Sequence, residues 1–544
     1  MDITTSGLLL LLAVVVGSVL ARASPVTLPL PLVQIALGAI IGAITNNAIE
    51  LRPDVFFLLF VPPLLFLDGW RINKERLLQD KGTILALALG LVAFTVLGAG
   101  LFIAWMIPAM PLGVAFALAA TLSPTDPVAV SAIAARVPIS ERVIHILEGE
   151  TLFNDASGLV CMRFAVAAIL TGTFSLIEVA RTFLWVAIGG VAIGVAVTWT
   201  VVKAKSWLVR RLGEETGSQI LISLLIPFGA YLVAEHFRCS GILSAVAAGI
   251  TMSHAEQSGL ALPTTRVRRT VVWDAVQFTA NGVIFVLLGE QLPHIVAGAA
   301  HVVRDTHHHE VAWLLVYILA INTVLSMLRF LWVWASLRLT LLRAAWTRQT
   351  LRKACWRMIA VISLGGARGA VTLAGALTLP MALNDGSPFP TRDLAVLLAA
   401  GVIACSLIAA SIGLPVVLKG LELLPEVSDQ QEEDWARVAA AEAAIRAVEH
   451  VVRDHADLRA SVYEEVAHHV IELYRHRINT RSKVGDEAAL LRKLDGIERQ
   501  LRIAGIHAER DTLYLLGRTR RISDDVVRKL VNELDLAENQ LVST

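Results

Sequence analysis

The chain has 544 residues, of which 56% are hydrophobic and only 17% are charged, and its mean hydropathy is +0.65. Because soluble proteins carry about 25% charged residues, this composition excludes an ordinary soluble protein. The net charge of +1 hides an uneven distribution: residues 1–420 hold 29 Lys/Arg and 22 Asp/Glu, whereas residues 421–544 hold 18 and 24. We predict an apolar membrane domain over 1–420 and a charged, soluble tail over 426–544.

About thirteen apolar segments approach or reach the roughly 20 residues that a helix needs to cross a bilayer. The first, GLLLLLAVVVGSVLA, lacks the basic stretch that precedes the core of a signal peptide, so we expect it to remain as a helix. The pattern predicts an all-α polytopic membrane protein. Its spans are expected near 5–22, 28–45, 53–70, 83–106, 112–135, 143–170, 180–202, 217–236, 240–254, 272–297, 311–337, 356–381 and 393–419.

The basic residues between these segments predict an orientation. With the N-terminus outside, the inside loops hold 20 Lys/Arg and the outside loops hold five. Because loops rich in Lys and Arg stay on the cytoplasmic side, we predict an external N-terminus and a cytoplasmic tail.

The fifth predicted span, ALAATLSPTDPVAVSAIAA, is interrupted by two prolines. Pro124 and Pro127 each remove a backbone donor and clash with the preceding turn, so the helix is expected to break there. Unwound backbone at mid-membrane lines a cavity or is buried in protein, and such broken helices hold ions in many secondary transporters. Thr125 and Asp126 lie within the break, and Asp126 is expected to offset the positive end of one half-helix. A mere proline kink would leave this carboxylate unexplained.

The twelfth predicted span, VISLGGARGAVTLAGALTL, carries Gly365, Gly366 and Gly369 around Arg368. Glycines permit unusual backbone angles and close packing, so we expect a second broken helix here. The fifth and twelfth spans are the middle members of two triplets with opposite orientations, and paired interruptions in such inverted repeats indicate a transport site. Arg368 also needs a carboxylate partner, and we predict Glu150 of the sixth span.

The sixth predicted span contains TLFNDASGLV, in which the side chains of Thr151, Asn154 and Asp155 can share one helix face. With carbonyls freed by a broken helix, they would make the all-oxygen shell that hard cations require. One or two net negative charges suit a monovalent ion better than Ca²⁺. Because a buried carboxylate can also take up a proton, we expect cation and proton to compete for Asp155.

Three further features carry weaker signals. Arg163 lies eight residues past Asp155, roughly 12 Å along a helix, and is expected to be a structural pair or an exit-path residue. Arg329 and Glu290 are expected to be helix-end anchors. The triplet His307–His309 is interpreted as an exposed loop, with a pH sensor or a metal site as the alternative.

Five ordered motifs resemble the monovalent cation:proton antiporter-1 family, which includes the NhaP-type bacterial exchangers and the animal sodium/proton exchangers. The resemblance implies thirteen helices, a homodimer in the bacterial inner membrane and electroneutral exchange by an elevator mechanism. The implied transport bundle spans about 83–170 and 311–419, and the implied dimerisation part spans about 5–70 and 217–297. The motifs are PPLLFLDGW, SPTDPVAVSAI, EGETLFNDASGLV, GVIFVLLGEQLP and GGARGAVTLAGAL.

The resemblance also assigns roles to ion-binding residues. The family's Asn-Asp pair matches Asn154 and Asp155, which makes Asp155 the shared carrier of cation and proton. The hydroxyl four residues earlier matches Thr151, and Thr125 of the TDP motif is expected to offer a backbone oxygen. Asp155, Thr151 and Thr125 are therefore the expected ligands of Na⁺.

Two other roles follow from the same resemblance. Asp126 matches the TDP aspartate, and Asp68 matches the acidic residue after PPLLF, where many NhaP-type members have Glu. The family's Glu–Arg pair, which braces the site, matches Glu150 and Arg368.

The tail begins after Pro425, and DWARVAAAEAAIRAVEHVVRDHADL has helical apolar spacing. Further helices are expected from about 461, 486 and 523. The tail carries no phosphate loop, zinc spacing or nucleotide-binding signature. A regulatory or dimer-stabilising domain and a solvated helical appendage both fit this pattern.

We predict an antiporter that exchanges Na⁺, or alternatively K⁺ or Li⁺, for H⁺, and no enzyme. Its expected partners are the cation, the proton, the lipid bilayer and a second copy of the chain, with no cofactor and no nucleic acid. The alternative function is a cation channel or an ion-sensing membrane receptor without proton coupling.

Overall fold

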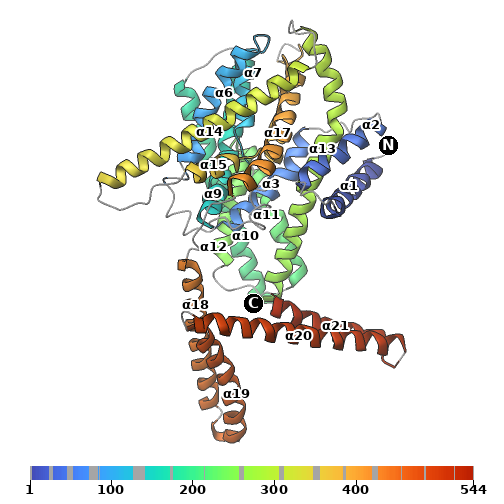
Figure 1. The fold of residues 1–544 in the computed structure, drawn as a ribbon, viewed down its shortest axis with the longest axis vertical. Helices are drawn as coiled ribbons and strands as arrows, with labels where there is room; N and C mark the ends of the chain where they lie inside the picture. The colour runs from blue at the N-terminus through green and yellow to red at the C-terminus, as the bar shows by residue number, and fades with distance from the viewer. Residues whose placement is uncertain are drawn as a thin grey trace. The chain divides into compact units, whose positions relative to one another are not determined.

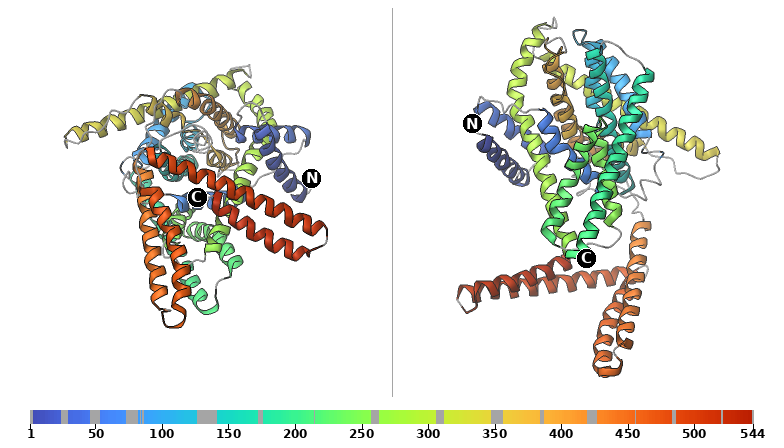
Figure 2. Two further views of the ribbon diagram at one scale, coloured as in Figure 1. Left: turned by 60° about the horizontal axis from the view of Figure 1, so that its bottom comes forward. Right: turned by 180° about the vertical axis from the view of Figure 1, so that it is seen from behind.

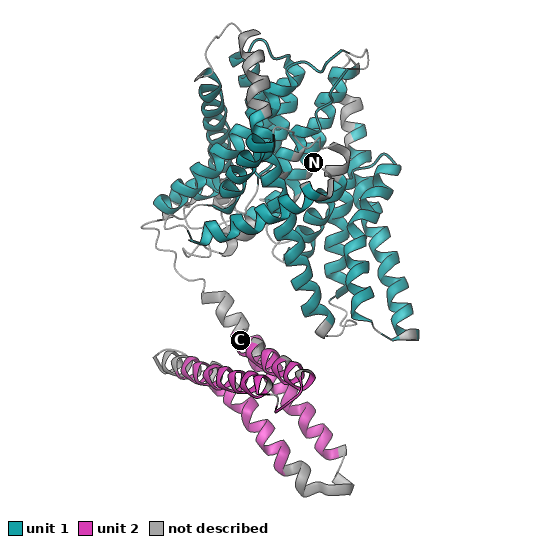
Figure 3. Ribbon diagram, turned by 90° about the vertical axis from the view of Figure 1, so that its right-hand side faces the viewer, with its two compact units in different colours: residues 1–423 teal, residues 424–544 magenta. Residues whose placement is uncertain are grey.

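In the computed structural model, the regular secondary structure of the described residues is helical, apart from one isolated bridge between Ala382 and Pro388. The chain divides into two compact units, residues 1–423 and 424–544 (Figure 3). The structure describes residues 3–23, 29–45, 53–72, 82, 84, 86–125, 141–171, 176–213, 215–256, 263–305, 312–346, 356–383, 387–418, 427–454, 456–482, 486–519 and 521–542.

Fifteen described helices make up the first unit (Figure 1). They are α1 (Ile3–Ala23), α2 (Leu30–Thr45), α3 (Pro53–Arg71), the π-helix η1 (Ala86–Leu91), α6 (Val92–Met106), α7 (Leu112–Leu122), α9 (Glu141–Thr171), α10 (Leu176–Leu212), α11 (Thr216–His236), α12 (Gly241–Glu256), α13 (Pro263–Asp305), α14 (Ala312–Trp346), α15 (Trp356–Leu364), α16 (Ala370–Leu377) and α17 (Arg392–Leu418).

Each of the apolar segments predicted from the sequence contains a helix. Within the described part of the chain, seven stretches are long and apolar enough to cross a membrane, and α1, α2 and α7 are shorter apolar helices. Large apolar side chains such as Trp105 (77% exposed) and Leu225 (65% exposed) point outward, as expected of helices that face lipid. The protein is therefore a multi-pass membrane protein, and the count of thirteen spans stays a prediction.

One group of helices in the first unit packs through very close backbone approaches. α2 lies along α13, and α12 lies between α3 and α10. Gly38 and Gly42 of α2 lie against the backbone of Val286 and Glu290 in α13, and Gly249 of α12 lies against the carbonyl of Phe66 in α3. Since a side chain at these glycines would collide with backbone, the pairs are held at a fixed and short separation.

A second group surrounds the interrupted helices. α7 packs against α6 and α9, while α14, α15 and α16 all contact α17. The core of this group is built from small and branched apolar residues, with Ala117, Leu118, Leu122, Leu398 and Ile403 all fully buried. A polar side chain buried among them costs free energy unless it is paired. The charged and hydroxyl groups at the helix breaks therefore need partners.

The second unit consists of two antiparallel helix pairs (Figure 2). α18 (Val427–Asp454) packs against α19 (Ala456–Ser482), and α20 (Asp486–Arg518) packs against α21 (Asp524–Val542). His507 and Arg510 of α20 both bind Glu538 of α21, and Arg510 also binds Asp535 at 2.7 Å. These ion pairs fix the alignment of α20 with α21.

Candidate ion-binding site

The helix of the fifth span ends where the proline pattern predicts. α7 stops at Leu122, and the backbone N–H of Ser123 donates to the carbonyl of Ala120. Pro124 and Thr125 are not helical, and Thr125 is buried. Asp126 and Pro127 lie outside the described residues, so the expected role of Asp126 stays a prediction.

The twelfth span is interrupted as well. α15 ends at Leu364 and α16 begins at Ala370, so the segment from Gly365 to Gly369 separates two half-helices. The backbone N–H of Arg368 donates to Ser406 Oγ of α17 at 3.0 Å, which satisfies a donor that the break would otherwise leave unpaired.

The two interruptions meet. Arg368 Nε donates to the carbonyl of Leu122 at 3.3 Å, and Thr372 Oγ1 donates to the carbonyl of Pro124 at 3.4 Å. The last carbonyls of a helix lack intrahelical donors and carry partial negative charge. Arg368 therefore caps the C-terminus of α7 from the interrupted segment between α15 and α16.

Glu150 forms the predicted ion pair, but its partner is Arg329 and not Arg368, so the prediction of Arg368 as the partner is wrong. Both carboxylate oxygens of Glu150 accept hydrogen bonds from Arg329, at 2.6 and 2.8 Å. Arg329 Nε also donates to the carbonyl of Ile362 in α15, at 3.1 Å. The side chains of Glu150 and Arg329 are 0% and 3% exposed, so the pair is a bidentate ion pair removed from water.

Arg329 is thus not the helix-end anchor that the sequence predicts. It lies inside the apolar stretch Trp313–Ser336 of α14, and its guanidinium turns inward to Glu150. Gly366 makes room for it, because a Cβ at this position would lie 2.5 Å from Arg329 Cζ. The signal that could have identified Arg329 is a lone charge in the middle of a long apolar span, which needs an internal partner.

Asn154 connects the ion pair to the break. Its Nδ2 donates to Thr125 Oγ1 at 3.2 Å, to the carbonyl of Ser123 at 3.4 Å and to Glu150 Oε1 at 3.5 Å. Thr125 Oγ1 donates in turn to Glu150 Oε1 at 3.4 Å. Three acceptors around Nδ2 fix the orientation of the carboxamide, so its Oδ1 points the other way.

The predicted oxygen ligands are buried around this network. Thr151, Asn154 and Asp155 are 8%, 0% and 4% exposed. Thr151 Oγ1 donates to the carbonyl of Leu147 at 2.9 Å, which leaves its lone pairs available to a cation. Among the residues that the structure describes, Asn154 Oδ1 and Ser123 Oγ are buried without a hydrogen-bond partner. Orphaned oxygens beside a buried carboxylate fit a desolvated monovalent cation.

The remaining predicted residues lie on other helices, further along α9 or outside the described residues. Asp68 lies on α3 near its C-terminal end with an exposed side chain, and its role as a ligand stays a prediction. Glu290 is 2% exposed within α13. Arg163 pairs with Glu235 of α11 at 3.1 Å, which agrees with the structural pair that was one of its two interpretations. His307–His309 lie outside the described residues.

The end of α7 meets the interruption between α15 and α16 beside the buried Glu150, within a bundle of long apolar helices. Such an arrangement is typical of the class of secondary transporters. Residues 9–420 match the family described as "Sodium/hydrogen exchanger, transmembrane". The chain belongs to the sodium/hydrogen exchanger family.

Relatives support the same assignment. The chain is 38% identical to "Uncharacterized Na(+)/H(+) exchanger YjcE" of Escherichia coli (strain K12), over all of this chain and 99% of the relative. It is also 38% identical to "Sodium, potassium, lithium and rubidium/H(+) antiporter" of Bacillus pumilus (strain SAFR-032), over 97% of this chain and 77% of the relative. The solved structure of the sodium proton antiporter MjNhaP1 from Methanocaldococcus jannaschii has the same fold, with a TM-score of 0.58 and 20% identity, over 78% of this chain and 100% of that one.

Proposed function

We propose that this protein exchanges a monovalent cation for a proton, with Asp155 as the group that carries either ion. The observation that carries the proposal is the burial of Asp155 and Thr151 on the same helix as Asn154, whose carboxamide donates to the carbonyl of Ser123 where α7 ends. At that point a cation can exchange its water shell for protein oxygens. A proton on the carboxylate neutralises the same charge, so either ligand allows the buried site to move.

Arg329 and Arg368 support this chemistry without binding the cation. Arg329 neutralises Glu150, so among the described residues of this cluster the carboxylate left to charge-balance a cation is that of Asp155. Arg368 neutralises the end of α7, which would otherwise add partial negative charge beside the site. One net carboxylate suits one monovalent ion, and we propose one-for-one, electroneutral exchange.

The remaining parts of the proposal concern the cation and the assembly. The name of the Bacillus pumilus relative includes sodium, potassium, lithium and rubidium, so K⁺ and Li⁺ are to be tested beside Na⁺. We propose a homodimer in the inner membrane, with the N-terminus outside and the tail in the cytoplasm. Elevator-type movement of α9 with the broken helices, relative to the group of α2, α3 and α10 to α13, would expose Asp155 to each side in turn.

Reconstitution tests the proposal. Purified protein in proteoliposomes with an imposed pH gradient is expected to dissipate that gradient when Na⁺, K⁺ or Li⁺ is added. Asp155→Asn should abolish this activity while the size-exclusion profile remains that of the folded protein. Asp393→Asn removes a carboxylate whose side chain is 62% exposed and should behave like the parent. Cation flux that leaves the pH gradient intact would instead identify a channel.

A further inference from the structure

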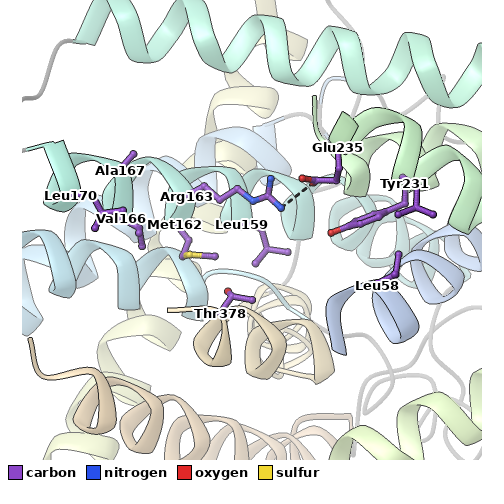
Figure 4. A pocket seen from close by; sticks show the side chains of 11 residues that line it. Leu58, Leu159, Met162, Arg163, Val166, Ala167, Leu170, Tyr231, Glu235 and Thr378 are labelled. Carbon is purple, nitrogen blue, oxygen red and sulfur yellow. Dashed lines mark hydrogen bonds and ion pairs between the residues drawn. The ribbon is translucent and has the colours of Figure 1, made fainter. Parts of the chain in front are cut away.

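A cavity of about 480 Å³ lies between α9 and α11 (Figure 4). Leu58 of α3 and Thr378, just after α16, close its other sides. Of the eleven side chains that line it, Arg163 and Glu235 are the charged ones, and most of the rest are apolar. Because apolar walls do not screen charges, these two residues dominate the electrostatic potential inside the cavity.

The two charges are paired across the cavity. Arg163 Nη2 donates to Glu235 Oε1 at 3.1 Å, and the two side chains are 48% and 34% exposed. α9 packs chiefly against α7, and α11 packs chiefly against α12, so the ion pair joins two helices that share little other contact. The pair is therefore only partly covered by protein and is not part of a packed helix interface.

The cavity approaches the proposed carrier. Leu159, which lines it, is one helical turn after Asp155 on α9, and Arg163 is one turn further. A unit charge at Arg163 is thus roughly 12 Å from Asp155 along the helix. At that separation, Coulomb's law with an effective dielectric constant between 20 and 80 gives about a two- to tenfold effect on the binding of a cation.

We propose that this cavity is an access vestibule for the monovalent cation, and that Arg163 and Glu235 set the affinity of the site by neutralising each other there. The inference rests on the proposed function of Asp155. A cation that passes the intact pair meets almost no net charge. If Glu235 loses its charge, the bare guanidinium of Arg163 repels the cation, whereas without the charge of Arg163 the bare carboxylate attracts it.

The experiment compares neutral variants of similar size in proteoliposomes. The half-saturating Na⁺ concentration is measured with Na⁺ added from each side of the membrane. Glu235→Gln should raise it about two- to tenfold and Arg163→Gln should lower it by a similar factor, on the side that reaches the vestibule. The double variant Arg163→Gln/Glu235→Gln should return close to the parent value. Both single effects should shrink as choline chloride raises the ionic strength.

Arg238→Gln is the matched control, because it removes an exposed positive charge just past the same end of α11 and does not line the cavity. This variant should leave the half-saturating Na⁺ concentration unchanged. The inference would be overturned if both single variants shifted the half-saturating Na⁺ concentration in the same direction. It would also be overturned if the double variant deviated from the parent more than either single variant did. Either result would assign the pair a purely structural role. Equal effects of Arg238→Gln would overturn it as well.

A fallback variant and a comparison of outcomes keep the experiment decisive. If a single variant is unstable in detergent, the charge-reversed pair Arg163→Glu/Glu235→Arg restores net neutrality and is expected to match the parent. If the parent protein exchanges no cation for protons, the proposed function itself is contradicted. Normal exchange with a half-saturating Na⁺ concentration that does not depend on these two charges would contradict only the proposed vestibule.

Discussion

At the scale of single residues, the buried pair of Glu150 and Arg329 determines how charge is distributed around the site. Removal of one partner from a buried ion pair leaves an uncompensated charge and typically costs about 3–5 kcal/mol, whereas removal of both is often tolerated. Glu150→Gln or Arg329→Met alone should therefore lower the melting temperature in detergent. The double variant should lose clearly less than the sum of the single effects.

A double-mutant cycle of Glu150 with Arg368 is the comparison for the cycle of Glu150 with Arg329. Arg368 hydrogen-bonds to the carbonyl of Leu122, while both oxygens of Glu150 bind Arg329. Glu150→Gln and Arg368→Gln should therefore show much weaker coupling than Glu150 and Arg329 do. Equal coupling energies in the two cycles would contradict the assignment of Arg329 as the partner.

The sequence could identify Glu150 as a buried carboxylate that needs a cation, but not which arginine reaches it. Arg329 and Arg368 lie in different helices, both within apolar surroundings, and only the packing of α14 against the broken helix decides between them. Asn154, Asp155 and Thr151 were accessible to sequence reasoning because their spacing along one helix determines their common face. Contacts between helices carry no such local signal.

At the scale of elements, the gap between α15 and α16 needs a residue without a side chain beside Arg329. A Cβ at Gly366 would lie 2.5 Å from Arg329 Cζ and 2.6 Å from its Nε. Gly366→Ala should displace the guanidinium, lower the melting temperature and reduce exchange activity. Gly229→Ala in α11 is the control, because no heavy atom lies within 4 Å of a Cβ placed there, and it should be neutral or slightly stabilising.

In the tail, the contact between α20 and α21 depends on Glu538. Hydrogen bonds from Arg510 and then His507 hold the pKa of this carboxyl below its usual value. A carboxyl whose pKa is lower in the folded state contributes stability above its unfolded pKa and loses that contribution as the pH falls through its folded pKa. Glu538→Gln should therefore accelerate amide hydrogen exchange in α21 at neutral pH, and the difference from the parent should vanish on acidification.

Glu533→Gln is the control for this measurement, because Glu533 is an exposed carboxylate on the same helix. It should leave exchange in α21 unchanged. Equal protection of α21 in the parent and in Glu538→Gln at neutral pH would show that the apolar contacts of the helix pair suffice without the ion pairs.

The positions of the helices follow from the sequence, but their lengths do not. Apolar stretches of about 20 residues locate the spans because the bilayer sets that length. α10, α13 and α14 continue well beyond their apolar stretches, since Lys, Arg and Trp are compatible with a helix outside the hydrocarbon core. The π-helical turn η1 was not predicted, because nothing in ALALGL departs from the pattern of an ordinary apolar helix.

At the scale of the whole molecule, the number of charges that the proposed carrier Asp155 moves determines the electrical behaviour. If Asp155 carries one cation in one direction and one proton in the other, a complete cycle moves no net charge. An imposed membrane potential should therefore leave the direction and rate of exchange unchanged. A steady transport current on solid-supported membranes would contradict one-for-one coupling.

The central claim is that cation and proton compete for Asp155, and the dependence of cation affinity on pH tests it most directly. The apparent KM for Na⁺ is to be measured in proteoliposomes with the same pH on both sides. If one proton displaces one cation, KM should rise as the pH falls, with a limiting slope of about tenfold per pH unit, while the maximal rate at saturating Na⁺ changes less. A KM that stays flat across the active pH range, with only the maximal rate varying, would contradict a shared carboxylate.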